Sequence, residues 1–357
     1  MRGIFLGDKI IKSRQSNFDL LRIISTFAVV LIHVNANVAD SNNISFVGFN
    51  FCSLINIITR FSVPCFVMLS GAFILNNERN ADYKHFYAKS FYKIGIPLII
   101  FSFLMLIISE VSAALKCAGF IEPILSLLKG DFNNYWFMFM LAGLYFLVPI
   151  IIRIKNTISK KCYTIGSFVW LLVAMISQLT STYSVAWSFG IIFSFVGYFL
   201  VGNVIYENMS RIKFKGLYFI FAIVSYALLF LYRGITGFSK FSIDAYSNWF
   251  SPLIIISSIC VFIAFSGIKI KINLGKLSGY TYVIYLLHTK VYIVLLKLLE
   301  KFIPSVTGNY IVYIAIVTIL AFIISCVGAM VYDFLWSLLE KKFKLKEKYN
   351  NWVNKSK

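Results

Sequence analysis

Apolar stretches long enough to cross a lipid bilayer recur along the whole sequence, and they constrain its fold more than any other feature. Hydrophobic residues make up 59% of the 357 residues, and the mean hydropathy is +0.81. A transmembrane helix needs about 20 mostly apolar residues. We therefore predict an all-α fold, a polytopic transmembrane bundle of about ten helices, with residues 1–340 forming a single membrane domain. The ten stretches are 18–38, 51–76, 91–112, 135–153, 162–180, 187–205, 216–233, 250–268, 278–299 and 309–337.

The distribution of basic residues predicts how these helices are oriented. The chain has 34 Lys and Arg against 14 Asp and Glu, a net charge of +20. Lys93, Arg153 and Arg233 lie at the ends of their stretches and are counted with the adjoining loops. Of the 34, 25 then lie in the N-terminal segment, the loops after even-numbered stretches and the C-terminal tail, and five lie in the opposite loops. Loops rich in Lys and Arg face the cytoplasm, so we predict that both termini are cytoplasmic. We expect residues 341–357 to form a basic tail at the membrane surface, with lipids and not nucleic acid as its partner.

The first apolar stretch carries a stripe of polar residues. Arg22 and His33 are eleven residues apart, which at about 100° and 1.5 Å per residue places them on one helix face about 16 Å apart. Asp19, Thr26 and Asn37 fall on the same face. Ionisable residues inside a span are costly and usually face a bundle interior or a water-filled cavity. The alternative is an Asp19–Arg22 ion pair at the membrane surface with a structural histidine.

The second stretch carries an arginine in its outer half. Arg60 lies about nine residues from the predicted outer end, at a depth comparable with His33. Pro64, four residues later, is expected to kink the helix or to leave a carbonyl group free. The alternative to a functional role is that Arg60 is a buried structural partner of Glu110, because charges within spans tend to pair.

A second polar stripe occurs in the ninth stretch. His288 lies near mid-membrane depth, and Thr281, Tyr285 and Tyr292 share its face. A hydrogen-bonded core histidine is the alternative interpretation. Trp136 lies at the outer end of the fourth stretch. It could belong to the aromatic belt at the membrane surface, or it could contact the substrate. With three histidines and six scattered cysteines, the sequence shows no metal-type spacing, and we expect no metal.

The same residues form blocks that resemble a known family. Arg22 and His33 form an Arg-x10-His pair, which is followed by RFSVPCFVMLSGAFIL from Arg60, then YWFMFMLAGLYFLVP and GYTYVIYLLHTKVY. In this order they resemble the membrane-bound acyltransferase-3 family over the whole chain. Cys65 and Ala72 depart from it, because bulkier aromatic residues are common there. We expect no appended esterase-like domain, which some members carry after the last span.

The resemblance implies an O-acyltransferase, most often an O-acetyltransferase, of the bacterial cytoplasmic (inner) membrane. The implied donor is cytoplasmic acyl-CoA, in particular acetyl-CoA, with no permanently bound cofactor. The implied acceptor is a hydroxyl of a cell-surface polysaccharide or its lipid-linked precursor, such as O-antigen. Residue by residue, the matches to the family's blocks are Arg22, His33, Arg60, Ser70, Trp136 and His288.

The chemistry of these side chains suits acyl transfer. A histidine can take the hydroxyl proton as a general base or carry the acyl group, and an arginine can stabilise the oxyanion. We expect His33, Arg60 and His288 to be catalytic, with His33 as the general base. We expect the substrate-binding residues to be Asp19, Arg22, Ser70, Trp136 and Tyr285. A flippase, an exporter or a polysaccharide polymerase is the alternative, although none of them explains the Arg-x10-His pair.

Overall fold

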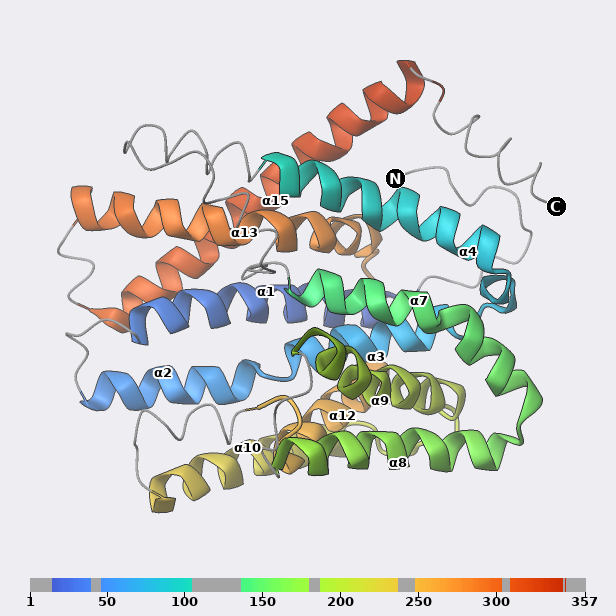
Figure 1. Ribbon diagram of the computed structural model, residues 1–357. Helices are drawn as coiled ribbons and strands as arrows, with labels where there is room; N and C mark the ends of the chain where they lie inside the picture. The colour runs from blue at the N-terminus through green and yellow to red at the C-terminus, as the bar shows by residue number, and fades with distance from the viewer. Residues whose placement is uncertain are drawn as a thin grey trace. The chain divides into compact units, whose positions relative to one another are not determined.

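The computed structural model describes residues 15–39, 46–104, 136–179, 187–236, 248–303, 309–342 and 344 (Figure 1). All regular structure in these ranges is helical, so the predicted all-α fold is confirmed. Contacts divide the chain into two compact units, residues 1–76 with 160–345, and residues 77–159 with 346–357. A single membrane domain over residues 1–340 stays a prediction, because compact units need not fold independently.

The first unit contains most of the described helices. They are α1 (Ser16–Ala39), α2 (Phe46–Thr59), α3 (Ser62–Ile74), α8 (Lys160–Leu179), α9 (Trp187–Glu207), α10 (Leu217–Thr236), α12 (Pro252–Ser266), α13 (Gly275–Phe302) and α15 (Tyr310–Lys342). The second unit contains the 3-10 helix η1 (Glu78–Ala81), α4 (Tyr83–Ser90), the π-helix η2 (Phe91–Gly95) and α7 (Trp136–Thr157).

Eight described helices are long and apolar enough to cross a membrane. They correspond to eight of the ten predicted stretches, and α2 and α3 together form one of them, Asn50–Ile74. The other two predicted stretches contain α8 and α12, and α12 is apolar but only 15 residues long. A polytopic helical membrane protein is thus confirmed, while ten spans and cytoplasmic termini stay predictions.

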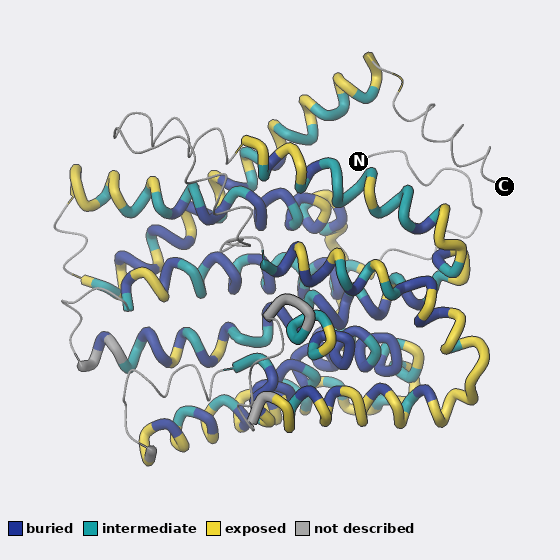
Figure 2. The backbone as a smooth tube through the Cα atoms, in the orientation of Figure 1, coloured by how far each residue is buried: buried dark blue, intermediate teal, exposed yellow. Residues whose placement is uncertain are grey.

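Helices α8 and α10 of the first unit expose large hydrophobic side chains, as lipid-facing helices do. Figure 2 shows α9 mostly dark blue, whereas α8 and α10 carry yellow segments that alternate with blue and teal ones. Because lipid tails are as apolar as a protein core, such helices expose hydrophobic side chains outward and keep polar ones inside. The exposed large side chains of α8 and α10 include Phe168, Val173, Ile220, Ile223 and Leu231.

Helices α3 and α9 approach each other closely enough for their backbones to touch. A Cβ atom built on Gly71 of α3 would lie 1.8 Å from the carbonyl oxygen of Phe199. A Cβ atom on Gly202 of α9 would lie 2.3 Å from the carbonyl oxygen of Met68. Both distances are far below van der Waals contact, so only glycine fits at these two positions. Small residues such as these permit close helix approach inside a membrane.

We expect Gly71→Ala to destabilise the protein, because the added methyl group would push α3 away from α9. Overpacking of this kind costs about 1–3 kcal/mol. Thermal unfolding of the detergent-solubilised protein should therefore begin at a lower temperature. Gly166→Ala is the matched control, since a Cβ atom on this α8 glycine meets nothing within 4 Å. Equal unfolding temperatures for Gly71→Ala and the wild type would contradict the close approach.

Candidate active site

Helices α1 and α13 bring the two predicted polar stripes together in one interface. The imidazole rings of His33 and His288 have their centroids 5.1 Å apart. Arg22 contacts Ser278 at one end of the interface, and Asn37 contacts Tyr292 at the other. Both contacts join residues 255 or 256 positions apart, so the two helices run parallel. A parallel pair fits the sequence-based topology, in which the first and ninth stretches cross the membrane in the same direction.

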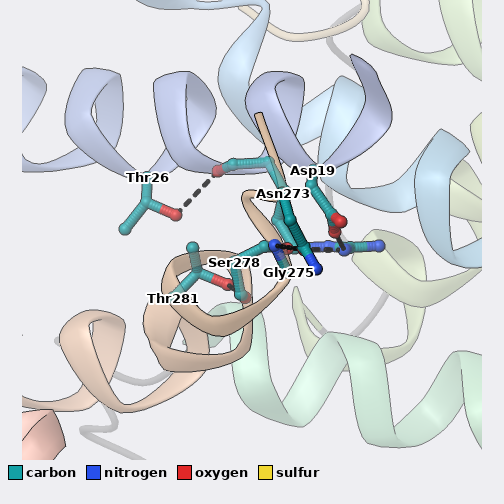
Figure 3. A network of polar contacts seen from close by, with 7 residues as sticks. Asp19, Thr26, Asn273, Gly275, Ser278 and Thr281 are labelled. Atoms are coloured by element: carbon teal, nitrogen blue, oxygen red, sulfur yellow. Dashed lines mark hydrogen bonds and ion pairs between the residues drawn. The ribbon is translucent and has the colours of Figure 1, made fainter. Parts of the chain in front are cut away.

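Arg22 is held at the N-terminal end of this interface. Its Nη1 atom donates to Asp19 Oδ1 at 3.1 Å and to Ser278 Oγ at 2.9 Å. Figure 3 shows Asp19 of α1 and Ser278 of α13 pointing toward the same place between the helices. Asp19 is buried, whereas the side chain of Arg22 is 28% exposed. The Asp19–Arg22 ion pair of the alternative interpretation is therefore present, and substrate binding by either residue stays a prediction.

The opposite end of α1 is also tied down by amide side chains. Asn37 Nδ2 donates to the Tyr292 hydroxyl at 3.2 Å, and Asn35 Nδ2 donates to the Cys52 carbonyl at 2.8 Å. Asn35 therefore ties α1 to α2, while Asn37 ties it to α13. The Tyr292 ring lies nearly parallel to that of His33, at an interplanar angle of 13° and 6.4 Å between centroids. The His33 ring thus lies beside two rings of α13, those of His288 and Tyr292.

His288 has a defined orientation and tautomer. Its Nδ1 atom lies 2.6 Å from the Tyr285 carbonyl oxygen, and its ring lies 5.3 Å from the Tyr285 ring. Because a carbonyl oxygen only accepts, Nδ1 carries a hydrogen, and in the neutral imidazole Nε2 then carries the lone pair. Nε2 is buried and has no hydrogen-bond partner within the described ranges. Tyr285 therefore orients His288 through its backbone, and direct substrate binding by Tyr285 stays a prediction.

Arg60 lies at a break between two helices. Helix α2 ends at Thr59 and α3 begins at Ser62, so the helix interruption predicted here is confirmed. Pro64 explains it, since proline has no N–H to donate to the carbonyl of Arg60, four residues earlier. Irregular backbone at membrane depth is tolerated where it is buried in protein or lines a cavity. The guanidinium lies within electrostatic range of the His33 imidazole, so the break brings a cation toward His33.

Sequence reasoning did not identify the aromatic partner of Arg60. The Trp249 ring centroid lies 5.3 Å from Arg60 Cζ, which is cation–π distance. Trp249 precedes α12 and lies 189 positions after Arg60 in the sequence. No spacing or periodicity in the sequence connects the two residues, so only the folded structure reveals the contact. The alternative partner of Arg60, Glu110, lies outside the described residues.

Ser70 and Trp136 are the two predicted site residues that remain. Ser70 is half-buried in α3. Trp136 begins α7 in the second unit, where its ring packs edge-on against Phe137 at 6.0 Å. Substrate binding by both residues stays a prediction. Among the described residues, no group of three His, Cys, Asp or Glu side chains is placed to hold a metal ion.

The fold and this cluster define a class of protein, an integral membrane protein of apolar helices with two histidines and an arginine gathered inside the bundle. Comparison with protein families identifies it further. The sequence pattern of the acyltransferase-3 family, described as an acyltransferase domain, matches residues 15–330. The chain therefore belongs to the acyltransferase-3 family and is a membrane acyltransferase. Among curated proteins and solved structures, no match is found.

Proposed function

We propose that this protein is an O-acetyltransferase of the bacterial cytoplasmic membrane. It moves an acetyl group from cytoplasmic acetyl-CoA to a hydroxyl of a cell-surface polysaccharide or of its lipid-linked precursor. The observation that carries this proposal is the cluster of His33, His288 and Arg60, because it combines two imidazoles with a fixed cation. Membership of an acyltransferase family supports the same chemistry.

In the proposed reaction, His33 is the general base. It takes the proton of the acceptor hydroxyl while that oxygen attacks the thioester carbonyl carbon. The carbonyl oxygen becomes a tetrahedral oxyanion, which the positive charge of Arg60 stabilises. When the intermediate collapses, the carbon–sulfur bond breaks, and the CoA thiolate takes the proton from the His33 imidazolium. Direct transfer of this kind needs no acyl-histidine, which would be the less favoured variant.

His288 has a supporting role in this proposal. Its Nε2 lone pair is available on the ring that faces His33, because Nδ1 is bonded to the Tyr285 carbonyl. A neutral imidazole acceptor beside His33 stabilises the imidazolium that forms during proton transfer, as the orienting third group of other catalytic sites does. His33 and His288 are therefore expected to act as a unit.

The donor is proposed to approach from the N-terminal end of α1. Acyl-CoA carries anionic phosphates, for which the partly exposed guanidinium of Arg22 is a suitable partner. The pantetheine arm would then lie along the interface between α1 and α13 toward His33. Helix geometry gives a separation of about 16 Å between Arg22 and His33, which an extended arm spans.

The proposal is tested by incubating the purified protein in lipid nanodiscs with radiolabelled acetyl-CoA and envelope polysaccharide from a bacterial host. We expect label in the polysaccharide as alkali-labile ester, together with stoichiometric release of free CoA thiol. A transporter or a polymerase would move or join glycans without releasing CoA. Absence of both ester and thiol across several bacterial polysaccharides would contradict the proposed acetyl transfer.

A further inference from the structure

Arg60 is held by an aromatic ring, and this contact has a consequence for its charge. A carboxylate partner, such as Asp19 for Arg22, brings a full negative charge to the guanidinium. An indole ring attracts the cation through its quadrupole and carries no net charge. The Trp249 ring therefore immobilises Arg60 without itself neutralising it. This matters for a group that must stabilise a developing oxyanion, because a neutralised cation does so poorly.

The segment that carries Trp249 is firmly anchored to the bundle. Tyr198 of α9 donates its hydroxyl to the Trp249 carbonyl. The adjacent Phe250 packs against the rings of Phe195 and Tyr198, with centroids 5.0 Å and 5.5 Å away. Phe195 also contacts the Trp249 ring at 6.0 Å. Tyr198 and Phe195 are fully buried, so Trp249 rests on the rigid aromatic face of α9.

The turn before α12 fixes the backbone on the other side of Trp249. The Asn248 side chain accepts from the backbone N–H of Phe250 at 3.2 Å, and the Asn248 carbonyl accepts from that of Ser251 at 3.0 Å. Pro252 then begins α12 at a position that favours helix initiation. Trp249 is thus clamped between a capped turn and an aromatic cluster. Such support from packed neighbours is what a residue needs in order to position another one.

We propose that Trp249 is a positioning residue for Arg60, holding the guanidinium beside His33 through a contact that adds no negative charge of its own. This inference rests on the proposed acetyl transfer and assigns Trp249 no contact with either substrate. It predicts that the charge distribution of the ring matters, and not only its volume. Phenylalanine at this position should therefore preserve more function than leucine, because its ring retains a weaker cation–π interaction.

The decisive experiment is a double-mutant cycle with Trp249→Leu, Arg60→Ala and the combined variant. A cation–π interaction of ordinary strength corresponds to an about 2- to 30-fold effect. We expect Trp249→Leu to lower kcat for acetyl transfer from acetyl-CoA by that factor while leaving KM for acetyl-CoA nearly unchanged. Trp249→Phe should restore part of the loss. In the Arg60→Ala background, Trp249→Leu should lower kcat no further.

Thermal unfolding of the same four proteins measures the contact without relying on activity. We expect Trp249→Leu to lower the unfolding temperature more in the presence of Arg60 than in its absence. Trp170→Leu is the matched control, since Trp170 of α8 stacks on Phe193 and contacts no arginine in the described structure. This control should retain kcat.

Two results would overturn the positioning role. One is equal kcat for the wild type and a folded Trp249→Leu variant. The other is a double variant in which the separate effects of Trp249→Leu and Arg60→Ala simply add, both in kcat and in unfolding temperature. A different result would be a wild-type protein that transfers no acetyl group although the unfolding temperatures still show coupling between Trp249 and Arg60. That result would refute the proposed function, and therefore also the catalytic purpose of the contact. The two failures are therefore distinguishable.

Discussion

His33→Ala is expected to lower the rate of acetyl transfer from acetyl-CoA by about 10²–10⁴-fold, the range for loss of a general base. His33 lies on the polar stripe of α1, with its ring facing His288 and parallel to Tyr292. His288 faces His33 from the other helix and is oriented by its Nδ1 bond to a backbone carbonyl, so it is expected to support His33 and not to take its place. Radiolabelled ester in the polysaccharide, measured in nanodiscs, gives the rate.

The control for this prediction is the third histidine of the chain. His85→Ala removes an imidazole from α4, in the second unit, and should leave the rate nearly unchanged. The double variant His33→Ala/His288→Ala should be little slower than His33→Ala, because residues that act as a unit are not additive. A folded His33→Ala variant with near-normal activity would exclude His33 as the base and assign that role to His288.

Arg22→Ala is expected to raise KM for acetyl-CoA by about 10- to 150-fold. The factor follows from losing a charge-assisted hydrogen bond to phosphate, which is worth about 1.5–3 kcal/mol. Arg22→Lys should recover only part of the affinity, because an ammonium group cannot make a bidentate phosphate contact. Arg60→Ala should instead lower kcat and leave the affinity for acetyl-CoA nearly intact. Initial rates over a range of acetyl-CoA concentrations separate the two effects.

The observed Asp19–Arg22 ion pair provides the competing explanation for Arg22. If Arg22 only neutralises the buried Asp19, Asp19→Asn should relieve the damage of Arg22→Ala, and the single variant should lose stability and not donor affinity. Arg211→Ala, which removes an exposed arginine bonded to Asn208, is the matched control and should leave KM unchanged. An unchanged KM in a stable Arg22→Ala protein would rule out the donor site.

Several features of this protein follow from the sequence alone. Hydropathy predicts the helices because a bilayer demands about 20 apolar residues and internally satisfied backbone groups for each crossing. The polar stripes of α1 and α13 follow from helical periodicity, which is a local property. The interruption after Arg60 follows from Pro64, four residues later, because proline removes a hydrogen-bond donor. The predicted intramembrane positions of His33 and His288 required no knowledge of which helices touch.

The tertiary structure decided which of these local features meet. The parallel packing of α1 on α13 places His33 against His288 across 255 residues of chain, and no periodicity encodes that register. The partners of the two arginines differ for the same reason. Asp19 is within one helical turn of Arg22, so the sequence suggested that pair, whereas Trp249 reaches Arg60 only through the packing of α9 and α12. Local patterns thus determined the helices and their polar faces, and long-range packing alone determined the site, because contacts between distant segments depend on the shapes of every helix between them.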